Sequence, residues 1–312
     1  MFRVLQWADS HLNNTAVAQV NSLIPVVPDL DLPVHCGDVT RAYYEQGTGS
    51  FDGSKSTCVI GNHDAIKQAG TQSGSYDWTV QPTQNALYND YLAIARSAFD
   101  LDMSVNTTWW CKEFPDKNVM FIGLNDCVFG SDYTNELAWL KNKLDYAESK
   151  GYALAVGKHL PSTYATVDSD CVFSSKYMKS ASYASDTSSV VNTYNGNPDS
   201  LMKAIIDSEC DVLYVLAGHE HADALTTITR SDGTKIPYIV SGSCVVDQFN
   251  DVARGAAGYT SHIVCNMVDY VPESNSLHVF RLGADGCKSG IPRKMIAWSY
   301  ADNKVVATCG RS

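Results

Sequence analysis

The sequence predicts an α/β (α+β) fold in which two mixed β-sheets form the inner layers of a four-layer sandwich flanked by helices. Three observations predict it. Short apolar runs alternate with amphipathic helical stretches in the first part of the chain, and mainly strand patterns follow from about residue 211. The 312 residues, 45% of them hydrophobic, suffice to bury a full core as one large domain or two small ones, and we expect a single domain over residues 1–312.

The first part of the chain begins with a strand, helix, strand unit. Residues 2–8 and 32–36 are short apolar runs, and residues 13–27 between them carry apolar side chains at helical spacing. Another helix is expected at residues 134–150, where leucines share one face and Gly151 follows the last turn. The other elements expected here are strands at residues 57–60, 119–124 and 152–156 and helices at 85–99 and 198–209.

From about residue 211 strands are expected at residues 212–217, 225–229, 236–241, 261–270 and 277–282. Two long segments carry no periodic pattern: residues 70–83, and an insertion at about residues 162–196 that is dense in Ser, Tyr and Asp. Loops of this length inside a domain are often functional or mobile, and others are surface excursions without a role. The sequence leaves both interpretations open.

The acidic balance and the apolar pattern limit the expected partners. The chain has 23 Lys and Arg against 34 Asp and Glu, a net charge of -11, which disfavours a surface for nucleic acid. An apolar stretch of the ~18 residues that a membrane helix needs does not occur in the sequence. We therefore expect neither nucleic acid nor a membrane as partner. Oligomeric and assembly partners are left open by the sequence.

The N-terminal segment and the cysteines favour a cytoplasmic protein. The apolar run after Met1 reaches Asp9 too early for a signal peptide. The 10 cysteines include no C-x-x-C pair and several lie in apolar runs, so buried free thiols are expected. A charged fraction of only 18% leaves a virion-associated or extracellular location, reached without a signal peptide, as the alternative.

Polar side chains follow the expected strands at five places. In chain order the motifs are Asp9-x-His11, Gly37-Asp38, Gly61-Asn62-His63-Asp64, His159 and Gly218-His219-x-His221. Because ligands gather at the carboxyl ends of strands in α/β sheets, these residues are expected to converge on one site. Residues two apart in an extended segment point the same way, so both Asp-x-His and His-x-His present paired ligands. Carboxylate, imidazole and amide donors without a thiolate suit Mn, Fe, Zn, Co or Ni.

The order of these motifs resembles the signature of the calcineurin-like metallophosphoesterase family over residues 2–243. The resemblance implies two divalent transition-metal ions, most readily Mn, Fe or Zn, at the C-terminal ends of the strands. It assigns Asp9, His11 and His221 to one metal, Asn62, His159 and His219 to the other, and Asp38 to both. It also implies hydrolysis of phosphoester bonds by a water that the metal pair activates.

His63 follows the expected ligand Asn62 and matches the family histidine that assists phosphate binding and protonates the leaving group. Protein phosphatases of the family continue from Gly-Asp to Asp-Arg-Gly, whereas residues 41–43 here are Arg-Ala-Tyr. The resemblance is therefore nearer to the phosphodiesterase branch, and a phosphodiester or a small phosphorylated molecule is the expected substrate. Arg41 either contacts the substrate phosphate or lies solvated on the surface. The same two alternatives apply to Lys158.

Two other functions remain open. A nuclease shares these motifs, although the net charge disfavours it. A structural component of a virion, or another surface-binding protein, would keep the fold and the metals but would have no need for His63. The remaining candidates are expected to be structural: His35, Cys36, Trp109, Trp110, His262 and His278.

Overall fold

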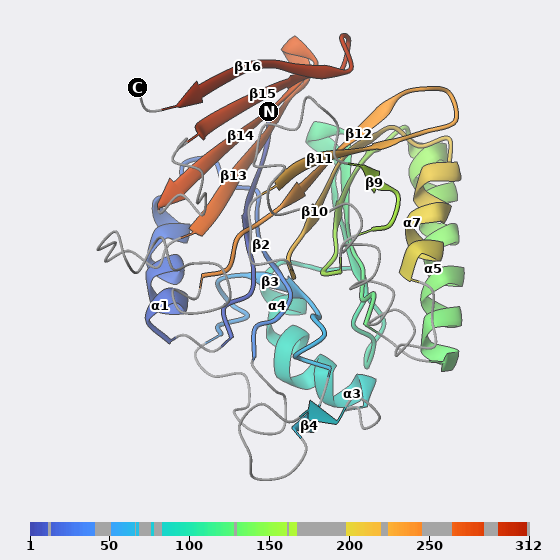
Figure 1. Cartoon of the computed structure of the whole chain (residues 1–312). Helices are drawn as coiled ribbons and strands as arrows, with labels where there is room; N and C mark the ends of the chain where they lie inside the picture. Colours follow the sequence, from blue (N-terminus) through green and yellow to red (C-terminus); the bar gives the residue numbers. More distant parts are fainter. Residues whose placement is uncertain are drawn as a thin grey trace.

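A computed structural model of the chain describes residues 1–11, 14–40, 51–65, 67–68, 76–77, 83–127, 130–160, 162–166, 198–219, 224–244, 264–283 and 293–310. Two seven-stranded mixed sheets pack against each other, and helices lie on their outer faces (Figure 1). This architecture confirms the expected fold class. A separate two-stranded ribbon pairs β4 (Lys67–Gln68) with β5 (Tyr76–Asp77).

The first sheet contains the N-terminal strands at one end and the C-terminal strands at the other, in the order β16-β15-β14-β13-β1-β2-β3. β1, β2 and β3 run parallel, whereas β1 pairs antiparallel with β13 and the remaining strands continue antiparallel. Its strands are β1 (Phe2–Trp7), β2 (Leu32–Cys36), β3 (Thr57–Val59), β13 (Val264–Val271), β14 (Ser276–Gly283), β15 (Arg293–Ser299) and β16 (Lys304–Gly310).

The second sheet has the order β6-β7-β8-β10-β12-β11-β9. Its four central strands β7, β8, β10 and β12 are parallel, and antiparallel strands close both edges. Its strands are β6 (Trp110–Phe114), β7 (Val119–Gly123), β8 (Ala153–Gly157), β9 (Ala165–Thr166), β10 (Val212–Ala217), β11 (Ala224–Thr229) and β12 (Lys235–Val240). Strands from the C-terminal part of the chain therefore complete both sheets.

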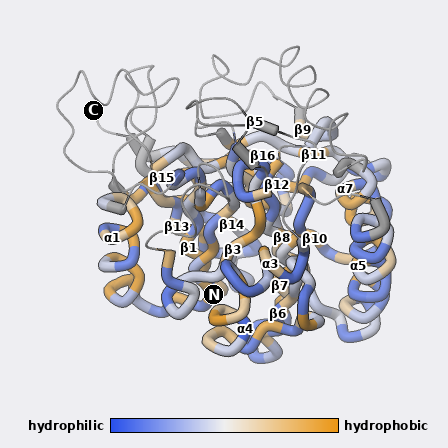
Figure 2. Tube along the Cα trace, turned by 90° about the horizontal axis from the view of Figure 1, so that it is seen from below, coloured by the Kyte–Doolittle hydropathy of each residue, from blue (hydrophilic) through white to orange (hydrophobic). Residues whose placement is uncertain are grey.

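The helices form the outer layers of the sandwich. α1 (Asn14–Leu23) covers the outer face of the first sheet, and α5 (Gly130–Lys150) and α7 (Pro198–Asp207) cover that of the second. Figure 2 shows α1 and α5 on opposite flanks with the strands between them. Among the described helices, none combines the length and hydrophobicity that a membrane span needs.

The side chains of β1 show how one strand serves two interfaces. Phe2 and Val4 point into the core between the sheets, whereas Leu5 and Trp7 pack under α1. Successive side chains of a strand face opposite sides, and here both faces are buried, so the strand appears in the sequence as a continuous apolar run. The same double burial applies to β7 and β10.

Two expected helices are irregular in the structure. The helix expected at residues 85–99 divides into α3 (Gln84–Leu87), a π-helical turn η2 (Tyr88–Leu92) and α4 (Ala93–Ala98). The helix expected at residues 13–27 ends as a 3-10 turn, η1 (Ile24–Val26), where Pro25 cannot donate a backbone hydrogen bond. Further 3-10 turns are η3 (Pro115–Lys117) and η4 (Pro272–Ser274).

The long loop segments are only partly described. Of residues 70–83 the structure describes β5 and Thr83, and of the insertion at about 162–196 it describes residues 162–166, which include β9. The organisation of the chain as one domain with an insertion stays a prediction.

Candidate metal centre

Five strand ends meet where the carboxyl edges of the two sheets adjoin. Asp9 N donates to the Gly37 carbonyl (3.0 Å), which joins the loops after β1 and β2. Gly218 N donates to the His159 carbonyl (3.2 Å), which joins the loops after β10 and β8. His219 N then donates to both carboxylate oxygens of Asp9, at 3.1 and 3.0 Å, and so connects the two sheets. The expected convergence of the motifs occurs for the described residues.

Two groups of ligand atoms form at this junction. One contains Asp9, His11 and Asp38, and the other contains Asp38, His159 and His219; within each group the ligand atoms lie within 4.8 Å of one another. Asp38 belongs to both. Its Oδ1 lies 3.3 Å from His159 Nε2 and its Oδ2 lies 3.8 Å from His11 Nε2.

Asn62 joins the second group through its amide oxygen. Asn62 Oδ1 lies 2.8 Å from His159 Nε2 and 2.9 Å from His219 Nδ1. Its side chain is almost fully buried, with 2% exposed. The structure therefore brings together six of the seven expected ligands, and the seventh, His221, lies outside the described residues.

The hydrogen bonds of His159 show that these residues fit a cation. Its Nδ1 donates to the Cys36 carbonyl (2.7 Å), because a carbonyl oxygen can only accept. Its Nε2 then faces two oxygen atoms, those of Asn62 and Asp38, and only a proton or a metal ion can satisfy that arrangement. Without a metal, burial disfavours the imidazolium, but the Asp38 carboxylate outweighs burial and raises the pKa of His159 to about 10.

Asp38 experiences the complementary effect. Burial alone would raise the pKa of its carboxyl, but His159, His63 and His11 outweigh burial and hold the pKa well below its usual value. The group is therefore a carboxylate with almost no exposure, 1%, surrounded by imidazoles. Buried carboxylates of this kind are stabilised by cationic partners or metal ions.

The backbone at the site is strained at the residues that carry donors. Asp9, His11, Asp38 and His219 all have left-handed φ values, of 52°, 41°, 56° and 74°. Such conformations are uncommon outside glycine and cluster at functional sites, where the surrounding structure enforces them. Asp9 and His11 therefore do not lie in an extended segment, as the Asp-x-His spacing had led us to expect, but in left-handed turns after the end of β1.

Three glycines permit the close approach of the loops. A Cβ at Gly61 would overlap Asp38 N and Oδ1, and a Cβ at Gly218 would lie 2.6 Å from the Cys36 carbonyl oxygen. A Cβ at Gly37, whose φ is +82°, would lie 2.5 Å from His159 Nδ1. Each loop can therefore hold its donor residue in place only because the neighbouring position has no side chain.

Asp64 is a buried residue of the site to which the sequence assigned no role. Its carboxylate accepts from Gly61 N (2.9 Å), Thr40 N (2.8 Å), Thr40 Oγ1 (2.9 Å) and Val39 N (3.3 Å). It thereby fixes the loop of Asp38 against the loop of Asn62. Burial, and then the nearby Asp38, raise its pKa to about 6. Its place in Gly61-Asn62-His63-Asp64 was the available sequence signal.

Two serines brace the loop after β1 and were also missed. Ser243 Oγ donates to the Asp9 carbonyl (2.7 Å), and Ser10 Oγ donates to the Val39 carbonyl (3.2 Å). His35 Nε2 lies 3.0 Å from Ser10 Oγ, so His35 of β2 also contacts this loop. Ser243 had no local signal, because it reaches Asp9 only through the pairing of Ala8 with Ser243 in the folded chain.

His63 lies at the accessible side of the centre. Its N–H donates to Asp38 Oδ1 (2.8 Å), and its ring stands edge-on to that of His11 with 4.9 Å between the ring centroids. Its side chain is partly exposed, whereas its neighbour Asn62 is buried. Among the described residues, the two ligand groups do not include His63.

Several other expectations have a clear outcome. Lys158 neither reaches toward a substrate nor lies on the surface: its side chain is fully buried and pairs with Asp126, because the end of β8 turns it away from solvent. Trp109 and Trp110 are packing residues, as expected, and Trp110 Nε1 donates to the Cys58 carbonyl (2.9 Å). Arg41 and His262 lie outside the described residues.

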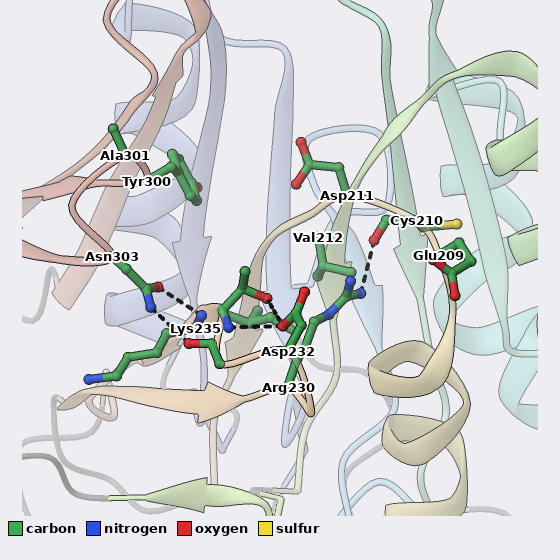
Figure 3. Close-up of a pocket in the computed structure, with 13 residues that line it drawn as sticks. Glu209, Cys210, Asp211, Val212, Arg230, Asp232, Lys235, Tyr300, Ala301 and Asn303 are labelled. Carbon is green, nitrogen blue, oxygen red and sulfur yellow. Dashed lines mark hydrogen bonds between the residues drawn. The ribbon is translucent and has the colours of Figure 1, made fainter.

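A cavity of about 570 Å³ opens at the other end of the second sheet. Its lining includes Val212 at the start of β10, Arg230 after β11 and Tyr300 in the turn before β16 (Figure 3). Arg230 Nη2 donates to the carbonyls of Ile205 (3.2 Å) and Cys210 (2.9 Å), and so caps the segment after α7. Because His219 follows the opposite end of β10, this cavity is separate from the candidate metal centre.

The fold of the chain is shared with a solved structure. The chain is similar to the crystal structure of a dimetal phosphatase from Danio rerio, with a TM-score of 0.53 and 12% identity over 96% of this chain and 99% of that chain. The structural likeness confirms, at the level of the fold, the resemblance to the calcineurin-like metallophosphoesterases.

Two further solved structures align over most of the chain with lower scores. A conserved uncharacterized protein from Streptococcus pneumoniae TIGR4, described as a predicted phosphoesterase, gives a TM-score of 0.34 at 12% identity, over 99% of this chain and 98% of that one. Phosphopantetheinyl hydrolase from Mycobacterium tuberculosis gives 0.38 at 13% identity, over 86% and 96%. No protein-family model and no curated protein matches the sequence.

Proposed function

We propose that this protein hydrolyses phosphoester bonds with the help of two divalent transition-metal ions. The observation that carries the proposal is the position of Asp38, which is shared by two groups of ligand atoms where the two sheets meet. A shared carboxylate between two sets of nitrogen and oxygen donors is the arrangement that a dinuclear centre needs. The fold of a dimetal phosphatase supports the same conclusion.

The assignment of ligands follows the two groups. We propose that Asp9 and His11, with His221, hold one ion, that Asn62, His159 and His219 hold the other, and that Asp38 holds both. The donors are carboxylate, imidazole and amide groups without a thiolate, which suits Mn, Fe or Zn.

The chemistry supplied when both ions are bound is neutralisation of charge on the phosphoryl oxygens and a lowered pKa for an attacking water. The residues of the chain orient the substrate and move the proton of the leaving group. The partial exposure of His63 and its ring contact with His11, without membership of either ligand group, support a role in that proton transfer. We propose His63 as the general acid.

A phosphodiester or a small phosphorylated molecule is the proposed substrate class, rather than a phosphoprotein. Residues 41–43 lack the Asp-Arg-Gly sequence of the protein phosphatases, and Arg41, three residues after Asp38, is the proposed contact to the substrate phosphate. Seven cysteines in the described part of the chain are buried free thiols, which supports a cytoplasmic location.

A substrate panel tests the proposal. Metal-stripped protein is reconstituted with Mn, Fe, Zn or Mg and assayed on a phosphomonoester, a linear phosphodiester and a cyclic nucleotide. We expect hydrolysis that appears with a transition metal and disappears with a chelator, and we expect faster turnover of a diester or a small phosphorylated molecule than of a phosphopeptide. Metal-replete protein without turnover on any of them would favour the surface-binding alternative, and metal-dependent cleavage of a labelled oligonucleotide would favour the nuclease.

A further inference from the structure

The residue that precedes His159 in the chain forms a buried ion pair. Lys158 Nζ and Asp126 Oδ2 are 3.2 Å apart, and both side chains are fully buried. The distance is that of an ion pair, although the ammonium group does not have the geometry of a directed hydrogen bond. Val156, two residues before Lys158, belongs to the same hydrophobic cluster as Leu140 of α5, which places the pair on the helix side of the second sheet.

Asp126 contacts the residues on both sides of His159. Its Oδ2 pairs with Lys158, the residue before, and accepts a hydrogen bond from Leu160 N (2.9 Å), the residue after. The carboxylate therefore holds the main chain at Leu160, after the histidine, and the side chain of Lys158, before it. On the opposite side, the His159 ring is held through Nδ1 by the Cys36 carbonyl (2.7 Å).

The segment that carries Asp126 is itself fixed. Leu124 N donates to the Gly157 carbonyl (2.9 Å), which continues the pairing of β7 with β8. Asn125 N donates to Glu136 Oε1 of α5 (2.7 Å), and Cys127 N donates to Asn125 Oδ1 (3.0 Å). Burial raises the pKa of Glu136 well above its usual value, and Asp126 is the carboxylate that lies within ion-pair distance of Lys158 Nζ.

We propose that Asp126 is a positioning residue that keeps His159 Nε2 directed at Asn62 and Asp38, an inference that rests on the proposed function. Hydrogen bonds from Asn125 to Glu136 of α5 and from Leu160 to Asp126 then connect α5 to the candidate metal centre. Residues that orient a ligand in this way typically change metal affinity by about 10- to 100-fold when they are replaced. The effect should be confined to the ion that His159 binds, since Asp9 and His11 are held by other bonds, from Asp9 N to Gly37 O and from His11 N to Asp38 O.

The test is a Mn²⁺ titration of metal-stripped protein by calorimetry, with Asp126→Asn compared with wild type. We expect wild-type protein to bind two ions, and the variant to bind one of them about 10- to 100-fold more weakly with the other unchanged. A matched control is Asp269→Asn, which breaks the partly buried pair of Asp269 with Arg3 (2.8 Å) at the far end of β1. This control should lower the unfolding temperature and leave both Mn²⁺ affinities unchanged.

A second variant keeps the test decisive if Asp126→Asn does not fold, because that change leaves Lys158 as an unpaired buried charge. The double variant Asp126→Asn/Lys158→Met removes the charge as well and should show the same weakening of one ion. Equal Mn²⁺ affinities in wild type and the double variant, or equal weakening of the binding of both ions, would overturn the role proposed for Asp126. The proposed function would be unaffected by that result. Wild-type protein that binds no Mn²⁺ would instead overturn the proposed function and this inference with it.

Discussion

At the scale of single residues, Asp38 is the group on which the candidate centre depends. It contributes ligand atoms to both groups, accepts a hydrogen bond from His63 N (2.8 Å) and sits in a left-handed conformation, with φ 56°. The sequence placed Asp38 correctly at the end of β2. Its contact with His159 joins residues 121 positions apart, which only the folded chain reveals.

The variant of His63, the proposed general acid, distinguishes a role in catalysis from a role in metal binding. A positioned general acid contributes about 10²- to 10⁴-fold to the rate, so His63→Asn should lower kcat by that range on substrates with poor leaving groups. Metal content should stay at the wild-type value, because His63 is outside the two ligand groups of the described residues.

The leaving group provides the control for this variant. Nitrophenolate needs little protonation, so the loss of kcat should shrink on nitrophenyl substrates. A variant that loses metal would show that His63 is a ligand, and full activity on poor leaving groups would show that the proton has another source.

His35 makes the stability of the metal-free protein depend on pH. Burial, and then the nearby His159, lower the pKa of His35 to about 3. Below the usual histidine pKa of about 6.5 the unfolded chain takes up a proton that the folded chain refuses, so this residue lowers the free energy of unfolding as pH falls. Between pH 7 and pH 5 the penalty grows by about 2 kcal/mol.

The measurement is chemical denaturation of wild type and His35→Asn, with chelator present, at pH 7 and pH 5. The variant should lose less stability than wild type over this interval, by about 2 kcal/mol. The opposite contribution of Asp64, whose raised pKa of about 6 favours the folded state at low pH, is present in both proteins and cancels. His278→Asn, at a partly exposed histidine, is the control. Equal pH dependence for wild type and His35→Asn would contradict the account.

At the scale of elements, the strands that the sequence predicted best are those buried on both faces. β1, β7 and β10 are continuous apolar runs in the sequence. The strands that were missed include the two-residue strands β4, β5 and β9. The longer ones, β6, β15 and β16, carry lysine, glutamate or arginine and lie at or near a sheet edge, where one face meets solvent. Their pairing is decided by neighbours distant in sequence, so no local pattern predicted them.

A side chain at Gly61, in the loop after β3, should disturb the candidate metal centre. Gly61→Ala would force the loop after β3 away from Asp38 N, at a cost of about 1–3 kcal/mol in stability, and should weaken metal binding at both ions because Asp38 is shared. Thermal unfolding and Mn²⁺ titration measure the two effects.

Gly151→Ala is the control for this change. Gly151 has φ +69° at the end of α5 with open space around it, so its replacement should destabilise the protein through backbone strain alone. Unchanged metal affinity is expected there. Unchanged affinity in Gly61→Ala as well would mean that the two loops are not in close contact.

At the scale of the whole molecule, the motif order predicted the candidate site because each motif directly follows a strand that pairs with a parallel neighbour. The contacts that brace the site were not predictable in the same way. Ser243 and Asp126 form hydrogen bonds with backbone atoms of Asp9 and Leu160. Because every residue type has these backbone atoms, the sequence does not reveal such contacts.

The most direct test of the central claim is an EPR titration of metal-stripped protein with Mn²⁺. If Asp38 joins two ions about 3.5–4 Å apart, the spectrum at saturation should show two magnetically coupled Mn²⁺ ions per chain. Asp38→Ala should abolish the coupling, since it removes the only carboxylate common to the two ligand groups of the described residues. Saturation at a single ion, or two ions with uncoupled spectra in the wild-type protein, would contradict the dinuclear centre.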